Sequence, residues 1–153
     1  MATPHARRVY LVRHGKAEAR SGGGDEARRL TSEGRARFAA LVKRLGARLR
    51  VERVLTSPLA RARETAEILA RATGAPLEDE PRLAAGRSGP RELVELVRRA
   101  APGTALVGHN PEIAEALAQL AEEDLDVKPG AVAALAADGK DVSLAWLEVP
   151  GKG

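Results

Sequence analysis

The sequence predicts a three-layer α/β/α sandwich with a mostly parallel central sheet. Two short apolar runs, Val9-Tyr10-Leu11-Val12 and Thr104-Ala105-Leu106-Val107, have the composition of strands that are covered by helices on both faces. Amphipathic helical patterns separate the strands along the chain. Such alternation of strands and helices is typical of a parallel sheet between two layers of helices.

Two strand–helix units fill the first half of the chain. We expect a strand over residues 8–13, a loop from Ala17 to Arg29 and a strand from Arg53 to Thr56. The loop contains Ser21-Gly22-Gly23-Gly24, which is no P-loop because no Gly-Lys-Ser/Thr sequence follows it. Between the two strands, apolar residues recur at helical spacing: Phe38, Leu41, Val42, Leu45 and Leu49.

The next helix is expected directly after the strand at Arg53–Thr56. Ser57 followed by Pro58 predicts an N-cap and a proline in the first helical position. The helix then carries apolar residues on one face and ends before a glycine and a proline; these residues are Leu59, Ala62, Ala66, Leu69, Gly74 and Pro76.

The second half continues the alternation and ends in two strands that we expect to be antiparallel. Its predicted elements are strand and loop over Leu77–Leu83, turns over Ala84–Pro90, a helix with Leu93, Leu96 and Val97, a strand at Thr104–Val107, a junction at Gly108–Pro111, a helix with Ile113, Leu117 and Leu120, and strands at Ala131–Ala136 and Val142–Val149 around the turn Asp138-Gly139-Lys140.

Length and composition are those of a soluble globular protein. The 153 residues are expected to form one domain over 1–153, with 44% hydrophobic and 30% charged residues. No apolar stretch approaches the roughly 20 residues that span a bilayer, and the N-terminus lacks the apolar core of a signal peptide. We therefore expect a cytoplasmic protein that does not associate with membranes.

Charge and residue usage exclude several classes of function. The net charge is +4, but basic and acidic residues are interleaved, and the chain has one Trp, one Tyr and one Phe. Nucleic-acid binding is therefore not expected, although the charge could attract an anionic substrate. The absence of cysteine excludes disulfides and thiolate chemistry, and no His/Asp/Glu cluster has metal-ligand spacing. Neither a metal nor another cofactor is expected.

Polar residues follow three of the predicted strands at the point where each strand ends. Arg13-His14 follows the first strand, Ser57 the second and His109-Asn110 the fourth. The carboxyl ends of parallel strands share one edge, where open α/β sheets bind ligands. Arg61 lies in the first turn of its predicted helix, and helix N-termini favour anions. Two arginines, two histidines and two helix N-termini at one edge predict a pocket for phosphate or sulfate.

These motifs resemble the histidine phosphatase superfamily, which includes the cofactor-dependent phosphoglycerate mutases. The similarity lies in Arg13-His14-Gly15, in Ser57-Pro58-Leu59-Ala60-Arg61-Ala62-Arg63-Glu64-Thr65-Ala66 and in Gly108-His109-Asn110, and a smaller element, Leu30-Thr31-Ser32-Glu33-Gly34, is also similar. The short chain looks most like bacterial phosphohistidine phosphatases of the SixA type.

The resemblance implies a role for each matching residue. His14 would be the nucleophile that takes the phosphoryl group, and the phosphoryl oxygens would be bound by Arg13, Arg61 and His109. A neutral imidazole can attack phosphorus without a general base, and arginine offers a permanent positive charge. Asn110 and Ser57 are weaker candidates for phosphate contacts, because Ser57 is first of all an expected N-cap.

The sequence departs from the mutases where these carry a glutamate as general acid. The corresponding stretch, Pro81 to Gly86, has no carboxylate; Glu78, Asp79 and Glu80 precede it. An ester releases an alkoxide that needs a proton, whereas phosphohistidine releases an imidazole like the attacking one. The missing acid therefore favours phosphohistidine as substrate.

We thus expect a phosphatase that hydrolyses phosphohistidine on a partner protein through phospho-His14, the partner being, for example, a phosphotransfer domain. Two alternatives stay open on the sequence alone. One is a phosphatase of small esters such as sugar phosphates or nucleotides. The other is a phosphate-binding module without catalysis on the same fold, although such a module would not need both histidines.

Overall fold

A six-stranded mixed sheet forms the centre of the molecule. The computed structural model describes residues 6–19 and 24–151, so part of the glycine run at 21–24 lies outside the described residues. The strand order is β3-β2-β4-β1-β5-β6. The strands are β1 Arg7–Arg13, β2 Arg53–Thr56, β3 Leu77–Asp79, β4 Thr104–Gly108, β5 Val132–Asp138 and β6 Asp141–Glu148.

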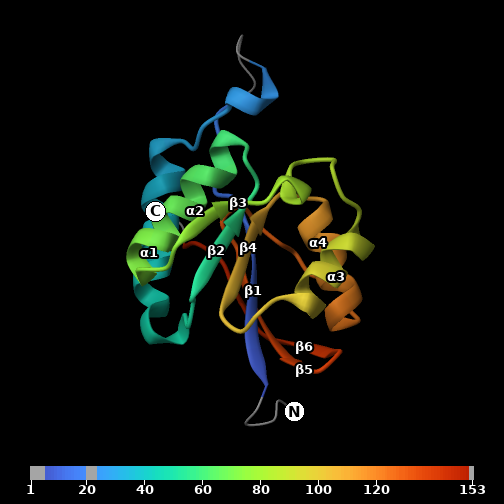
Figure 1. Ribbon diagram of the computed structural model, residues 1–153. Helices are drawn as coiled ribbons and strands as arrows, with labels where there is room; N and C mark the ends of the chain where they lie inside the picture. Colours follow the sequence, from blue (N-terminus) through green and yellow to red (C-terminus); the bar gives the residue numbers. More distant parts are fainter. Residues whose placement is uncertain (1–5, 20–23, 152–153) are drawn as a thin grey trace.

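Four strands are parallel, and the last two are antiparallel. β1 pairs with β4 in parallel and with β5 antiparallel, while β2 pairs in parallel with both β3 and β4. β5 and β6 form the expected antiparallel hairpin. Helices cover both faces of this sheet (Figure 1), which confirms the predicted α/β/α sandwich with a mostly parallel sheet.

The two helical layers use alternate side chains of the same strands. In β1, Tyr10 and Val12 face the core under helices α1 and α2, whereas Val9 and Leu11 face the core under α3 and α4. This explains the unbroken apolar run in the sequence, because both faces of β1 are buried. The helices are α1 Ser32–Leu45, α2 Ala60–Thr73, α3 Pro90–Arg99 and α4 Glu112–Ala121.

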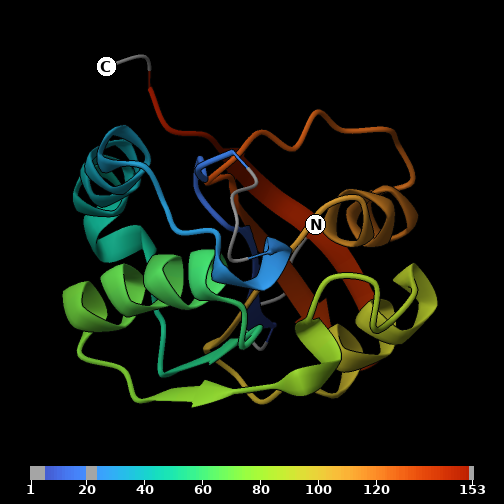
Figure 2. The ribbon, with the colours of Figure 1, turned by 90° about the horizontal axis from the view of Figure 1, so that it is seen from above.

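Three short 3₁₀ turns, Asp25–Ala27, Gly46–Arg48 and Pro81–Leu83, complete the described elements. The first lies inside the predicted loop from Ala17 to Arg29 and is placed over the carboxyl-terminal edge of the sheet, as the view from above shows (Figure 2). None of the helices in the described ranges is long and apolar enough to cross a bilayer.

The predicted cap of the second helix is wrong. Helix α2 begins at Ala60 with Leu59 in the N-cap position, and no side chain caps it. Ser57 remains outside the helix because its hydroxyl accepts a hydrogen bond from the Leu59 N–H (3.2 Å) and lies 2.7 Å from Nε2 of His109. A tertiary contact thus overrides the local signal of Ser57-Pro58.

Hydrogen bonds between neighbouring strands align the ends that carry the polar residues. Arg13 in β1 is the register partner of Gly108 in β4, and the His14 N–H donates to the Gly108 carbonyl (3.0 Å). The Ser57 N–H donates to the Val107 carbonyl (2.9 Å). The loops after β1, β2 and β4 therefore begin at the same level of the sheet.

Gly34 lets the start of α1 pack against the loop that follows β1. A Cβ at this position would collide with the backbone oxygen of Lys16 and approach the Lys16 nitrogen to 3.1 Å. The Thr31 N–H donates to the same Lys16 oxygen (3.0 Å), and the Thr31 hydroxyl accepts from the Gly34 N–H (2.9 Å), so this contact is tightly held.

Replacing Gly34 with alanine is expected to lower the free energy of unfolding by about 1–3 kcal/mol, the usual range for overpacking. Alanine by itself favours a helix by about 1 kcal/mol over glycine. A loss of stability in Gly34→Ala would therefore show that the steric clash outweighs this gain. Urea unfolding measures the difference. Gly89→Ala is the control, since a Cβ there meets nothing within 4 Å. A Gly34→Ala protein as stable as the parent would contradict the close packing.

Candidate active site

His14 is held at the end of β1 by its backbone and by its ring. Its N–H donates to the Gly108 carbonyl, and its carbonyl accepts from the Gly130 N–H (2.9 Å). Nδ1 of the ring lies 2.7 Å from the Gly15 carbonyl oxygen. A carbonyl only accepts, so Nδ1 carries the proton and Nε2 keeps its lone pair. Nε2 of His14 is therefore available as a nucleophile.

Helix α2 supports the loop behind His14 through Thr65. The Gly15 N–H donates to the Thr65 hydroxyl (3.0 Å), which in turn donates to the Arg61 carbonyl (2.9 Å). Thr65 is fully buried. A single side chain thus connects the loop after β1 to the first turn of α2, from which Arg61 extends.

His109 lies beside His14 at the end of β4. The two ring centroids are 5.1 Å apart, with the planes tilted by 59°. His109 is 3% exposed, and its Nε2 lies 2.7 Å from the Ser57 hydroxyl oxygen. Its Nδ1 is buried and has no hydrogen-bond partner in the described part of the chain. The structure thus brings together three of the residues predicted from separate strand ends.

Burial keeps both imidazoles neutral. It lowers the pKa of His14 to about 4, against the effect of the Gly15 carbonyl and with a further decrease from the cations Arg61, Arg13 and Arg28. Burial is also the main cause that lowers the pKa of His109 to about 3, with the neighbouring His14 adding to it. At neutral pH, His14 is therefore an uncharged imidazole among positive charges.

Arg61 is buried at the site and pairs with Asp25. It is 4% exposed, and its guanidinium donates to the Asp25 carbonyl (2.8 Å) and carboxylate (3.1 Å). Arg28 donates to the other oxygen of this carboxylate (3.1 Å). The hydrogen bond from Arg28, reinforced by Arg61, holds the pKa of Asp25 below its usual range. Asp25 therefore remains ionised and accepts hydrogen bonds from both arginines.

Arg13 and Asn110 share one backbone acceptor. The Arg13 guanidinium (2.9 Å) and the Asn110 amide (3.0 Å) both donate to the Val127 carbonyl. The Asn110 oxygen accepts from the Ala114 N–H (3.2 Å), so both ends of this amide bind the protein itself. Nε of Arg13 is buried without a partner among the described residues. Arg13 thus retains a donor for an anion, whereas Asn110 orders the start of α4.

Two of the three carboxylates that precede Pro81 are engaged with arginines outside this group. Asp79 pairs with Arg63, and Glu80 pairs with Arg82 (2.6 Å), which lowers the pKa of Glu80. Neither is among the groups that shift the pKa of His14 or His109. Asp25 is the carboxylate that does act on His109.

Sequence reasoning missed Asp25 and Arg28. Both belong to the segment around the 3₁₀ turn Asp25–Ala27, which the sequence presents as a loop without periodicity. The segment is fixed from its other end by Glu64 of α2, whose buried carboxylate accepts from the Leu30 N–H (2.8 Å) and from Arg29 (2.9 Å). Glu64 and Thr65 lie within the motif at residues 57–66, so that motif holds the loop as well as the site.

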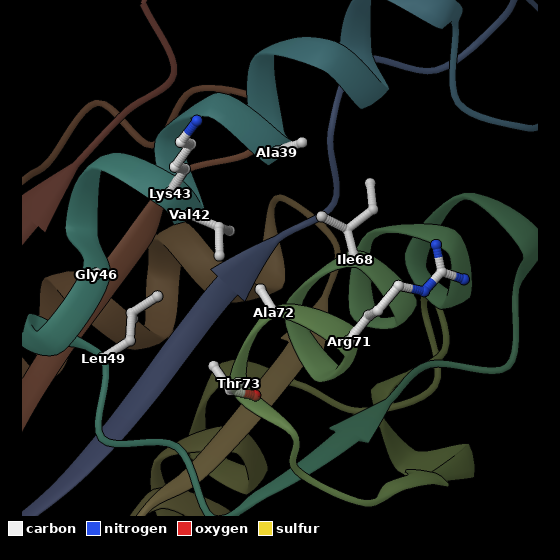
Figure 3. A pocket seen from close by; sticks show the side chains of 9 residues that line it. All are labelled: Ala39, Val42, Lys43, Gly46, Leu49, Ile68, Arg71, Ala72 and Thr73. Carbon is white, nitrogen blue, oxygen red and sulfur yellow. The ribbon is translucent and has the colours of Figure 1, made fainter.

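The candidate site is defined by its polar groups and not by the depth of a cavity. A pocket of about 510 Å³ lies between α1 and α2 (Figure 3), where Val42, Leu49 and Ile68 contribute to its lining, and it contains none of the site residues. Within residues 6–19 and 24–151, no three His, Asp or Glu side chains gather as metal ligands would.

Comparisons with known proteins find relatives of this chain in sequence and in fold. Residues 9–92 match the model of the histidine phosphatase superfamily (branch 1). An uncharacterised protein of Picosynechococcus sp. is 38% identical over 113 residues, which are 70% of this chain and 68% of the relative.

Solved structures of similar proteins cover almost the whole chain. The proposed phosphohistidine phosphatase SixA of Agrobacterium tumefaciens has a TM-score of 0.83 and 27% identity, over 95% of this chain and 99% of that chain. A protein histidine phosphatase SixA complexed with tungstate has a TM-score of 0.80 and 24% identity, over 94% and 97% of the two chains.

The low pKa of His14 predicts a specific dependence of stability on pH. An unfolded histidine titrates near 6.5, so between about pH 6.5 and 4 the unfolded chain binds a proton that folded His14 does not. The free energy of unfolding should therefore decrease as the pH falls through this range. In His14→Asn this decrease should be smaller, as measured by urea unfolding at several pH values. Parallel curves for the two proteins would contradict a neutral His14 with a lowered pKa.

Proposed function

The chain belongs to the histidine phosphatase superfamily, and from this premise we propose that it hydrolyses phosphohistidine on another protein through a phosphoryl group held on His14. The observation that carries the proposal is the state of His14. Its Nδ1 is fixed by the Gly15 carbonyl, its ring is neutral, the cations Arg61 and Arg13 act on it, and the His109 ring lies 5.1 Å away.

In the first step, Nε2 of His14 attacks the phosphorus atom, and the bond from phosphorus to the substrate imidazole breaks. The substrate histidine, which carries a proton on its other ring nitrogen, leaves with the electron pair of that bond as a neutral imidazole. The phosphoryl group is then bonded to His14, whose ring carries the positive charge. In the second step, water attacks the phosphorus, the bond to Nε2 breaks, and inorganic phosphate is released. His14 is thereby regenerated with its proton still on Nδ1.

The surrounding cations supply what phosphoryl transfer mainly requires. Its transition state spreads negative charge over three oxygens, so positioning and positive charge provide most of the acceleration. Arg61 is rigidly placed by Asp25, and Arg13 by the Val127 carbonyl, so both guanidinium groups are oriented before a substrate binds. Arg28 adds a third positive charge close enough to lower the pKa of His14.

The ionised state of Asp25 supports phosphohistidine over an ester. A carboxylate that protonates a leaving alkoxide must carry a proton at neutral pH, which requires a raised pKa. The pKa values of Asp25 and Glu80 are lowered instead, each by a hydrogen bond from an arginine. An imidazole leaving group resembles the attacking one and does not depend on such an acid.

We also propose that residues 1–153 act as one domain and that the partner is a protein carrying phosphohistidine. One sheet joins the described elements from Arg7 to Glu148, which supports a single unit. Tungstate, like phosphate, is a tetrahedral oxyanion, and the SixA protein crystallised with it shares this fold. An anion of that shape is therefore the natural ligand to expect beside His14.

His14→Ala is expected to abolish phosphate release from a protein whose histidines have been phosphorylated with phosphoramidate, a loss of about 10³-fold or more. The parent protein should also accumulate acid-labile phosphate on itself, and the variant should not. Arg63→Ala is the matched control, because Arg63 lies two residues from Arg61 but is exposed and paired with Asp79. Release by His14→Ala at the rate of the parent would refute the assigned nucleophile.

The substrate class is tested by comparing kcat/KM for this phosphoprotein with kcat/KM for sugar phosphates and nucleotides. We expect an advantage of about 10²-fold or more for the phosphoprotein, the size of the general-acid contribution that an ester requires. Faster turnover of any ester would overturn the substrate assignment. Binding of inorganic phosphate without turnover of either class would favour a module that only binds phosphate.

A further inference from the structure

The contact between Ser57 and His109 determines which ring nitrogen carries the proton. Ser57 is fully buried and His109 nearly so, and their atoms Oγ and Nε2 lie 2.7 Å apart. Burial keeps His109 neutral at physiological pH. A neutral imidazole has one N–H and one bare nitrogen, so one of the two nitrogens can donate a hydrogen bond and the other can only accept.

The second partner of Ser57 indicates the direction of this hydrogen bond. The Leu59 N–H donates to Oγ at 3.2 Å, so one lone pair of the hydroxyl is already used. If Nε2 carried the proton, Oγ would accept twice, and its own proton would need another acceptor. If instead the hydroxyl donates to Nε2, both the Ser57 hydroxyl and Nε2 of His109 have their hydrogen-bond partners, and no further acceptor is needed. The second arrangement places the ring proton on Nδ1.

Nδ1 of His109 is the atom that lacks a partner. It is buried and forms no hydrogen bond with the described residues, and its ring centroid is 5.1 Å from that of His14. A phosphoryl group on Nε2 of His14 carries three negatively charged oxygens close to this ring. An N–H at Nδ1 would attract such an oxygen, whereas a bare nitrogen would repel it.

We propose that Ser57 is a positioning residue whose hydroxyl donates to Nε2 of His109 and thereby makes Nδ1 an N–H donor for an anion beside His14. The expected effect of Ser57 on turnover rests on the proposed phosphatase function, whereas the expected position of the ring proton of His109 does not.

Both histidines then carry their ring proton on Nδ1, but the chemical consequence differs between the two rings. The Gly15 carbonyl accepts from Nδ1 of His14 and so exposes the lone pair of Nε2 for attack. The Ser57 hydroxyl binds the lone pair of Nε2 of His109 and so leaves Nδ1–H to donate. One ring becomes a nucleophile and the other a neutral donor, although the pKa of both is lowered.

Long-range ¹H–¹⁵N correlation spectra of histidine-labelled protein test the inference directly. Protonated and bare ring nitrogens resonate far apart, so the spectrum of the whole chain at pH 7 shows which nitrogen of His109 is protonated. We expect Nδ1 in the parent protein and a shift of the proton toward Nε2 in Ser57→Ala. Adding inorganic phosphate should perturb the Nδ1 resonance of the parent. Protonation of Nε2 in the parent would overturn the proposal.

Turnover provides the second readout. In Ser57→Ala we expect kcat to fall by about 10- to 100-fold with a smaller change in KM, because a donor to the developing charge is lost. Ser57→Thr keeps the hydroxyl and should recover most of the activity. Thr73→Ala, which removes a hydroxyl bonded to the Leu69 carbonyl at the far end of α2, should behave like the parent.

The outcomes separate this proposal from the proposed function. If the proton lies on Nδ1 only when Ser57 is present, but no phosphoprotein or ester is hydrolysed, the inference about Ser57 stands and the phosphatase proposal fails. If Ser57→Ala retains the proton on Nδ1 and the kcat of the parent, the role of Ser57 is refuted while the phosphatase proposal stands.

Discussion

The site depends on the register that main-chain hydrogen bonds set between β1 and β4. The His14 N–H donates to the Gly108 carbonyl, which places His14 next to His109, the residue that follows Gly108. Both faces of these strands are buried, so a slip by one residue would exchange the side chains that face the two cores. The geometry of the two histidines is therefore fixed by the packing of the core, far from any ligand.

Positive charge is concentrated at this edge, and the structure balances it in two ways. The histidines stay neutral because burial and neighbouring cations disfavour their protonated forms. Asp25 supplies one ionised carboxylate between Arg61 and Arg28. A phosphoryl group brings more negative charge than Asp25 does. Nε of Arg13 and Nδ1 of His109 are buried and have no partner among the described residues, so they are the nitrogens at which the anion would bind in the proposed reaction.

The sequence predicted the fold and the convergence of strand ends, because periodicity and strand order determine both. It could not predict Asp25 or Arg28, since their positions follow from a turn that is held by Glu64 from another element. Ser57 was misjudged for a related reason. Its local pattern favours an N-cap, but in the folded chain its hydroxyl bonds to His109, which lies 52 residues away in sequence.

The loop between α4 and β5 supports the site through the main chain of Val127 and not through the side chain of that residue. Arg13 and Asn110 both donate to the main-chain oxygen of residue 127, which every amino acid provides. Point substitutions there would alter packing in the core but would leave the acceptor in place. Insertions or deletions between α4 and β5 would move the acceptor itself. The geometry of the arginine is thus encoded in the length of a loop, a property that residue-by-residue motif matching does not detect.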